Sequence, residues 1–157
     1  MKNKITFTLN GEQHSVEVRA NQTLLDLLRD QMGIKSPKKG CDRGDCGSCT
    51  VMLNGRSVRS CLILAPEVDG CSVTTLEGLM KDGIHIVQQV FHEKNAFQCG
   101  FCAPGIIISV VELLNRNPNP SRHDVQEAIA GNLCRCTGYE SIIDGVLEAA
   151  ERMRGVQ

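Results

Sequence analysis

The cysteines are the residues of this chain best suited to chemistry. Nine occur among its 157 residues, and eight of them form two groups of four. The first set is Cys41, Cys46, Cys49 and Cys61, and the second set is Cys99, Cys102, Cys134 and Cys136. No apolar leader follows Met1, so we expect a cytoplasmic protein whose thiols stay reduced. Reduced cysteines in such number predict metal ligands or redox groups rather than a disulfide scaffold.

The first set has the spacing of a binuclear iron–sulfur site. Its pattern is C-x4-C-x2-C-x11-C, and the first three cysteines match the plant-type [2Fe–2S] ferredoxins. The loop around them also holds three glycines and three basic residues: Gly40, Gly44, Gly47, Lys38, Lys39 and Arg43. The glycines would let backbone N–H groups approach the sulfurs of an anionic cluster. The basic side chains would either offset its negative charge or simply face solvent.

Zinc is the alternative metal for the first set. Structural zinc sites usually take two C-x2–4-C pairs that a longer segment separates. Here three cysteines lie close together among glycines, and the fourth follows alone. This arrangement favours [2Fe–2S] over zinc.

The second set follows the pattern C-x2-C-x31-C-x1-C. Cys99 and Cys102 alone would resemble a thioredoxin-type redox pair, because Pro104 places them just ahead of a predicted helix. However, no βαβ pattern precedes them, and Cys134 and Cys136 supply two more thiolates ahead of another predicted helix. Helix N-termini would aim N–H groups at an anionic cluster there. The second set therefore predicts a second cluster.

The remaining residues with ligand chemistry are one cysteine and four histidines. Cys71 lies in a strand-like stretch and is predicted to be a small buried hydrophobe. Histidines that bind iron–sulfur clusters occur as a pair beside cysteine motifs. The four in this chain are scattered, so surface positions are expected for all of them: His14, His85, His92 and His123. No Ser-His-Asp grouping or carboxylate pair stands out, so no catalytic residue is predicted.

The first half of the chain, which must position the first set, has a β-rich pattern. It predicts two hairpins, a short helix and a last strand: residues 5–18, 50–62, 24–32 and 73–75. Asn10-Gly11 and Asn54-Gly55 supply the hairpin turns, and Thr23 is placed to cap the helix. Together these elements indicate a β-grasp, plant-type ferredoxin-like domain.

After Leu76 the pattern becomes helical, with apolar residues at the spacing of one helix face. Four helices are expected: residues 84–91, 104–115, 121–131 and 142–150. The predicted fold class is therefore α+β, with a β-grasp domain over residues 1–76 followed by an all-α four-helix [2Fe–2S]-binding domain over residues 77–157.

Composition excludes several function classes. Hydrophobic residues make up 41% and charged residues 22% of the chain, which is typical of globular proteins. A net charge of −1 and only 3% aromatic residues argue against nucleic acid or an anionic membrane surface as a partner. The longest apolar run, residues 106–111, is far shorter than the ~20 residues of a membrane span.

Three motifs resemble the small iron–sulfur subunit of the molybdenum hydroxylases. They are KGCDRGDCGSCTV at residues 39–51, QCGFCAPG at residues 98–105 and GNLCRCTGY at residues 131–139. This family includes the xanthine dehydrogenases, nicotinate dehydrogenase, aerobic-type carbon monoxide dehydrogenase and 4-hydroxybenzoyl-CoA reductase. The chain departs from the family pattern at a few positions, such as Ser48 and Ala103, none of which is an expected ligand.

The resemblance implies an electron-transfer subunit that turns over no substrate alone. A large partner subunit would hold molybdenum on molybdopterin and a medium one FAD, in a dimer of heterotrimers. Electrons would pass from molybdenum through the second-set cluster, then the first-set cluster, to FAD. By the same resemblance Gln98 and Cys136 would contact the pterin. The alternative for Gln98 is a loop amide that its own backbone satisfies.

The resemblance leaves the substrate open. A purine or another aromatic heterocycle such as xanthine is expected, and a complex like 4-hydroxybenzoyl-CoA reductase, nicotinate dehydrogenase or carbon monoxide dehydrogenase is the alternative. Two hypotheses from other classes are a free-standing ferredoxin-like carrier and a zinc-stabilised interaction module. A carrier would not need a second cluster in a helical domain, and a zinc module would be colourless.

Overall fold

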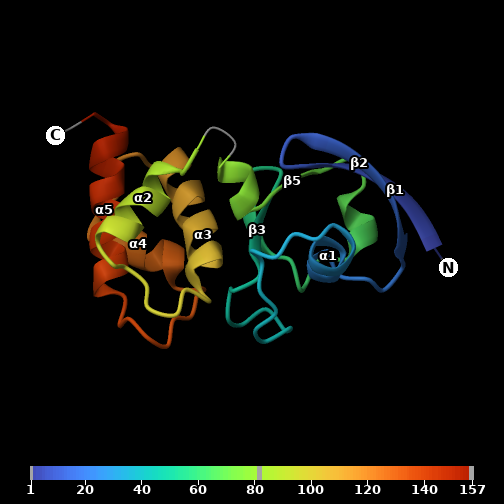
Figure 1. Cartoon of the computed structure of the whole chain (residues 1–157), viewed down its shortest axis with the longest axis horizontal. Helices are drawn as coiled ribbons and strands as arrows, with labels where there is room; N and C mark the ends of the chain where they lie inside the picture. The colour runs from blue at the N-terminus through green and yellow to red at the C-terminus, as the bar shows by residue number, and fades with distance from the viewer. Residues whose placement is uncertain (1, 81–82, 156–157) are drawn as a thin grey trace.

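The computed structural model describes residues 2–80 and 83–155. The predicted domain ranges, 1–76 and 77–157, therefore include a few positions that lie outside the described residues. The fold is α+β. Figure 1 shows the strands together with α1 (Leu24–Asp26) on one side, and α2 to α5, which lie within residues 86–153, on the other. Strand β1 (Lys2–Leu9) and helix α5 (Glu140–Met153) lie at opposite ends of the molecule (Figure 1).

One mixed sheet forms the first half. Its strands are β1 (Lys2–Leu9), β2 (Glu12–Arg19), β3 (Thr50–Leu53), β4 (Arg56–Arg59) and β5 (Ser72–Thr74). Their order is β2-β1-β5-β3-β4, with β1 and β5 parallel and the other neighbours antiparallel. The strand that closes the sheet, β5, is therefore added last in sequence between the two hairpins.

The first hairpin forms as predicted. Asn10 and Gly11 both have positive φ, of 52° and 85°, which suits the right-handed twist of the strands on either side. Ile5, Phe7 and Leu9 alternate along β1 and are buried at 3%, 1% and 5% exposure. One face of β1 therefore forms part of the core.

The second hairpin is shorter than predicted. It turns at Asn54-Gly55 as expected, but its second arm ends at Arg59 rather than at residue 62. The chain leaves the sheet there because the backbone of Ser60 and Ile63 accepts hydrogen bonds from the start of α1. This departure places Cys61 in a turn beside β3 instead of in a strand.

A short helical segment covers the sheet. It consists of α1 (Leu24–Asp26) and the π-helical turn η1 (Leu27–Gln31), and the Thr23 hydroxyl accepts a hydrogen bond from the Asp26 N–H as an N-cap. Leu24, Leu27 and Leu28 are fully buried against strand residues. The predicted cap and the predicted helix are both confirmed here.

The second half is helical. After the 3-10 turns η2 (Ala65–Val68) and η3 (Leu76–Met80) come α2 (Ile86–Glu93), α3 (Ala103–Arg116), α4 (Arg122–Ile129) and α5 (Glu140–Met153). Ser121 caps α4 by accepting from the Asp124 N–H. Among the described residues, no helix has the length and apolar character that crossing a membrane requires.

The start of α2 differs from the prediction. Ile84 lies before the helix and is 73% exposed. His85 is the N-cap, and its ring accepts a hydrogen bond from the Val87 N–H. His85 is thus half-buried at a helix end rather than on the surface, and burial lowers its pKa.

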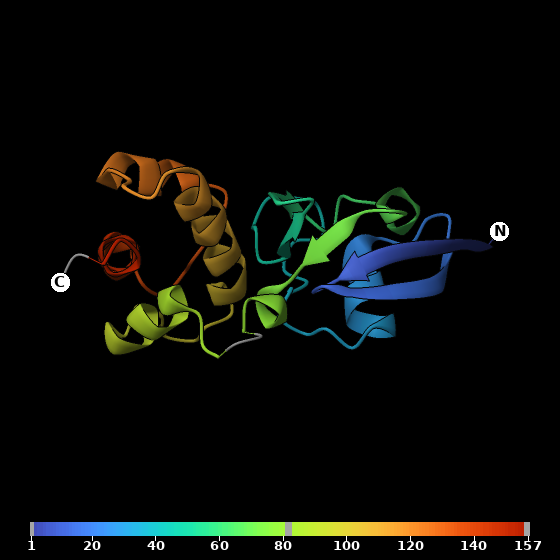
Figure 2. The ribbon, with the colours of Figure 1, turned by 90° about the horizontal axis from the view of Figure 1, so that it is seen from above.

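Helix α3 is the element that joins the two halves. It packs against α2 and α4 on one side and against β3 and β4 on the other (Figure 2). Its residues from Gly105 to Val111 are all buried, so neither side of the helix meets solvent in this stretch. A helix in such a position needs apolar residues on all sides, and Ser109 is the one hydroxyl residue within this stretch.

Glycine is required where α3 meets the first half. A Cβ on Gly105 would overlap the carbonyl oxygen of Gly47, which lies in the loop of the first set. Gly47 has φ of 71°, and a Cβ there would overlap the carbonyl oxygen of Gly131. Backbone atoms cannot move aside as side chains can, so these contacts fix the distance between the halves.

We predict that Gly105→Ala lowers the melting temperature of the chain. Alanine gains about 1 kcal/mol of helix propensity, but overpacking against a backbone oxygen costs about 1–3 kcal/mol. Gly145→Ala is the matched control, because its Cβ would meet only the ring of Phe91, at 2.7 Å. Since a ring can shift, Gly145→Ala should lie between wild type and Gly105→Ala in a thermal melt followed by circular dichroism. A Gly105→Ala protein as stable as wild type would contradict the tight joint.

Candidate metal centres

The hairpin of β3 and β4 brings two cysteines of the first set together. Cys49 immediately precedes β3 and Cys61 follows β4, so the pairing of the two strands places them side by side. Their sulfurs are 3.4 Å apart. Both side chains are buried, at 2% and 6% exposure.

The other two cysteines of the first set form a second, outer pair. The Cys46 N–H donates to the Cys41 sulfur at 3.3 Å, and both residues are half-buried. A Cβ on Gly40 would lie 2.8 Å from the Cys46 sulfur, so glycine is needed to let the backbone pass this close. The loop therefore holds its thiols as two pairs, of which one is buried and the other is half-buried.

Backbone dipoles and burial act on the two pairs in opposite directions. Hydrogen bonds from the backbone N–H groups of Arg43 and Cys46 lower the pKa of the Cys41 thiol to about 7. Burial, aided by the adjacent Cys49, raises the pKa of the Cys61 thiol to about 12. Two buried thiols this close ionise together only when a cation compensates them. A bound metal is such a cation.

The basic residues of the loop bond to other partners. Lys39 pairs with Asp26 and Asp42, and Arg43 pairs with Asp45. The Lys38 ammonium donates to the backbone carbonyl three residues before it. The basic side chains therefore fit the alternative in which they face solvent. The hydrogen bonds that lower the pKa of Cys41 come mainly from backbone N–H groups.

The second set is also arranged as two pairs. Cys102 is the N-cap residue of α3, and Cys134 contacts its sulfur. The sulfurs of Cys99 and Cys136 are 3.6 Å apart. Cys102 is buried and Cys134 half-buried, whereas Cys99 and Cys136 are both exposed. One pair therefore lies inside the helical half and the other at its surface.

The inner pair of the second set has unequal thiols. Burial raises the pKa of Cys102 to about 12. Burial acts in the same sense on Cys134, but the Thr137 hydroxyl and the N–H groups of Cys136 and Thr137 outweigh it and lower the pKa of that thiol. Cys134 is thus the better stabilised thiolate of the two.

The paired arrangement tests which metal group fits. Four thiolates around one tetrahedral zinc, with Zn–S of about 2.3 Å, lie about 3.8 Å from one another. In the part of the chain that the structure describes, no three of these sulfurs lie mutually within 4.8 Å. Two separate pairs in each set instead suit two metal ions with two thiolates each. The donor set and its geometry fit [2Fe–2S] rather than zinc.

Gln98 lies beside the exposed pair. Its side-chain amide donates to the carbonyl oxygen of Cys136 at 2.9 Å, and the residue itself is exposed. The structure therefore brings together the two residues predicted to contact the pterin. The amide is satisfied by the backbone of the cysteine loop rather than by its own backbone.

A buried network connects the two sets, and the sequence did not reveal it. The Leu133 N–H donates to the Cys46 carbonyl at 2.9 Å. The amide of Asn132, 2% exposed, donates to the Gly47 carbonyl at 3.1 Å and accepts from the Ser109 hydroxyl at 2.9 Å. Its position just before Leu133 in the third motif is the one signal that could have drawn attention to it.

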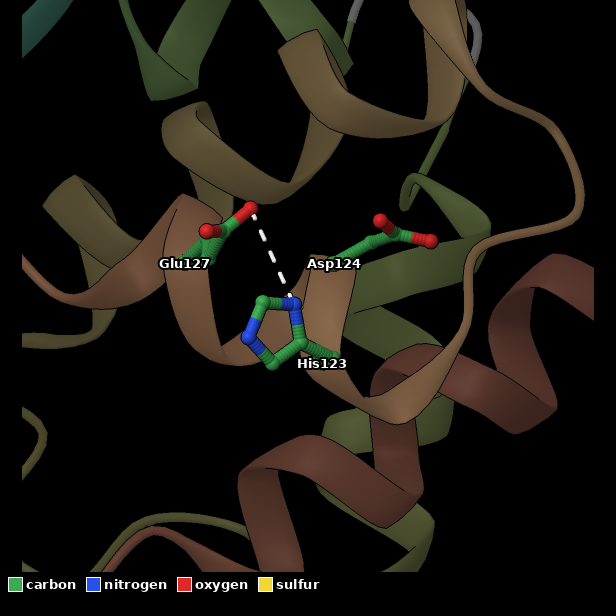
Figure 3. A group of neighbouring side chains, drawn as sticks. All are labelled: His123, Asp124 and Glu127. Carbon is green, nitrogen blue, oxygen red and sulfur yellow. Dashed lines mark ion pairs between the residues drawn. The ribbon is translucent and has the colours of Figure 1, made fainter.

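Other residues with ligand chemistry do not belong to either set. His123, Asp124 and Glu127 group on α4, with the His123 ring 3.9 Å from Glu127. Figure 3 shows the Asp124 carboxylate turned away from that pair, because it accepts hydrogen bonds from Ser121. One of the three ligands is already engaged and the other two are exposed, so we assign no metal to this group. Cys71 is half-buried ahead of β5, less enclosed than predicted.

Two family models match the chain. The model described as the 2Fe-2S iron-sulfur cluster binding domain matches residues 7–86, and the one described as the [2Fe-2S] binding domain matches residues 75–147. Each matched segment contains one complete set of cysteines.

Named relatives and solved structures extend this similarity over nearly the whole chain. The small FeS subunit of nicotinate dehydrogenase from Eubacterium barkeri is 47% identical over 96% of this chain and 98% of its own. A probable xanthine dehydrogenase component from Bacillus subtilis (strain 168) is 39% identical, with 98% and 86% covered. A chain in the crystal structure of quinoline 2-oxidoreductase from Pseudomonas putida 86 has a TM-score of 0.94 and 42% identity, with 98% and 97% covered.

We predict that each set holds about half of the iron. Cys46→Ala and Cys136→Ala should each reduce iron and acid-labile sulfide from about four to about two per chain, because each removes one ligand from one set. Cys71→Ala is the matched control and should keep all four. The measurement is iron, zinc and sulfide analysis of anaerobically purified protein. Stoichiometric zinc in the wild type, or full iron in both ligand variants, would contradict the assignment.

Proposed function

This chain belongs to the family of small iron–sulfur subunits of the molybdenum hydroxylases, and we propose that it transfers electrons within such a complex. The observation that carries the proposal is the pair of cysteine sets, each arranged as two thiol pairs and joined by a backbone hydrogen bond. A protein that only bound zinc for stability would need neither the pairing nor the joint.

The eight cysteines are the proposed ligands. The first set would hold one [2Fe–2S] cluster and the second set another. When bound, these clusters supply one-electron chemistry between a molybdenum–molybdopterin centre in a large subunit and FAD in a medium subunit. The chain contributes thiolates, backbone N–H donors and a rigid frame that keeps the two sets at a fixed separation.

Burial divides the work between the pairs. Cys49, Cys61 and Cys102 are buried, so these ligands exclude water from the inner side of each site. Cys99 and Cys136 are exposed, which leaves this pair open to a partner's cofactor. Electron donors and acceptors must approach closely, so the exposed pair is the proposed entry side.

Gln98 is proposed to position that entry side. Its amide donates to the Cys136 carbonyl, which holds the backbone of an exposed ligand in place. An exposed amide beside an exposed ligand is also well placed to contact a pterin, which carries many hydrogen-bond donors and acceptors. Gln98 and Cys136 are therefore the proposed pterin contacts of this chain.

The domain division proposed is residues 1–76 and 77–157. The last strand, β5, ends at Thr74 and η3 begins at Leu76, so the change of structure supports this boundary. The second domain would be a four-helix unit of α2 to α5. In one of the hydrogen bonds that connect the two proposed domains, the Ser36 hydroxyl donates to the Glu77 carboxylate at 2.5 Å.

The proposed partners are the large and medium subunits, in a dimer of heterotrimers. A net charge of −1 gives no support for nucleic acid as a further partner. Reduced thiols in this number suit a cytoplasmic location, which we propose for the complex.

The proposed substrate of the complex is an aromatic nitrogen heterocycle, with a purine such as xanthine included. Nicotinate, xanthine and quinoline, which name the relatives above, share a ring nitrogen that activates the neighbouring carbon. A subunit of a 4-hydroxybenzoyl-CoA reductase-like, nicotinate dehydrogenase-like or carbon monoxide dehydrogenase-like complex is the alternative. A free-standing carrier is the alternative from another class, and molybdenum-containing chains in the purified native protein would distinguish the two.

We predict that Gln98→Ala slows electron entry without changing iron content. In the assembled complex, the visible cluster absorbance should bleach at least several-fold more slowly after substrate addition. The reason is that the Cys136 carbonyl loses its hydrogen bond from the Gln98 amide. Stopped-flow absorbance under anaerobic conditions measures this rate. Gln126→Ala is the matched control, since it changes an exposed glutamine on α4 and should leave the rate unchanged.

Two outcomes would count against the role of Gln98. An unchanged rate in Gln98→Ala would remove the residue from the entry side. Loss of iron would assign it to retention of the second-set cluster instead. Analysis of subunit composition for each variant ensures that a slow rate does not reflect incomplete assembly.

A further inference from the structure

The loop between the last two ligands and α5 contains a hydroxyl aimed at a ligand sulfur. Thr137 Oγ1 lies 3.1 Å from the sulfur of Cys134. Among the residues that the structure describes, no other side-chain hydroxyl donates to any sulfur of the two sets. Both sets receive backbone N–H groups, and the second set has this side-chain hydroxyl in addition.

The surrounding bonds fix the direction of the hydroxyl proton. The Tyr139 N–H donates to Thr137 Oγ1 at 3.2 Å, so that oxygen acts as an acceptor on one side. Its own proton is donated to the Cys134 sulfur. The hydroxyl is an oriented donor rather than a freely rotating group.

Tyr139 holds the loop in this shape. Its backbone has φ of 72°, a left-handed conformation that is unusual for an aromatic residue. Its phenol accepts from the Cys134 N–H at 2.7 Å and donates to the Asn132 carbonyl at 3.1 Å. The Tyr139 phenol thus connects the end of the loop back to its beginning, and these bonds hold Thr137 in place beside Cys134.

A donor held against a thiolate changes the redox properties of what the thiolate binds. A hydrogen bond to sulfur withdraws negative charge and stabilises the more negative, reduced state of an iron–sulfur centre. The effect is strong where water does not compete, and Cys134 is only half-exposed. Removing the donor therefore makes reduction harder.

We propose that Thr137 raises the reduction potential of the second-set cluster through its hydroxyl bond to Cys134. This inference rests on the proposed function, in which the second set holds a [2Fe–2S] cluster. Thr137 is a positioning and tuning residue, because it acts through the ligand and touches no substrate. It adjusts the entry cluster independently of the first set.

The test is a redox titration of the full chain in its purified complex, followed by electron paramagnetic resonance. Thr137→Val removes the hydroxyl and keeps the shape, so the potential of the second-set signal should fall. Thr137→Ser restores the hydroxyl and should return the potential to that of wild type. The first-set signal of the same sample is the internal control and should not move.

Tyr139→Phe separates tuning from loosening of the loop. It removes the phenol bonds to Cys134 and Asn132 but leaves Thr137 in place, so its shift should be smaller than that of Thr137→Val. An equal or larger shift would overturn the proposal, as would an unchanged potential in Thr137→Val or a Thr137→Ser protein that resembles it. Loss of second-set iron in Thr137→Val would also overturn it by making Thr137 a retention residue.

Failure of the proposed function gives a different result. In that case the wild type would lack the second-set signal and its iron, whatever residue stands at position 137. A wild type with both signals and a Thr137→Val potential equal to its own would refute the tuning role alone.

Discussion

The close approach of two backbone segments is the constraint on which the rest of the structure depends. The loop of the first set meets the segment before the third motif's cysteines, where Asn132 donates to the Gly47 carbonyl and Leu133 donates to that of Cys46. Because Asn132 is buried, an unpaired amide there would cost roughly 1–3 kcal/mol. Its bonds to Gly47 and Ser109 avoid that cost. They also hold the two halves of the chain in one relative position.

Packing around this joint explains the small residues in it. Gly47 and Gly105 each lie where a Cβ would overlap a carbonyl oxygen of a facing segment. Helix α3 can then serve both halves, as the centre of the helical core and as the wall behind β3. The partly exposed ion pairs that connect the end of α2 with α5, such as Lys94 with Glu148, add little by comparison, since water and salt screen them.

Each set combines one enclosed pair of thiols with one pair nearer the surface. In the first set the enclosed pair comes from strand pairing, and in the second set it comes from the start of α3 and the loop before α5. Enclosure protects a cluster from water, and partial exposure permits exchange of electrons with a partner. The two halves therefore meet both requirements, protection from water and access for a partner, with unrelated secondary-structure elements.

The sequence by itself determined the local features. Cysteine spacing indicated two binuclear sites, Asn-Gly steps gave both hairpin turns, and Thr23 was visible as a helix cap, because each of these depends on residues a few positions apart. Only the tertiary structure decided which sulfurs pair, why glycine stands at position 47, and that Asn132 joins the halves. Asn132 and Gly47 are 85 positions apart, and their contact depends on how α3 packs against β3. No local pattern records such a contact, because a buried amide and a solvated one look the same in sequence.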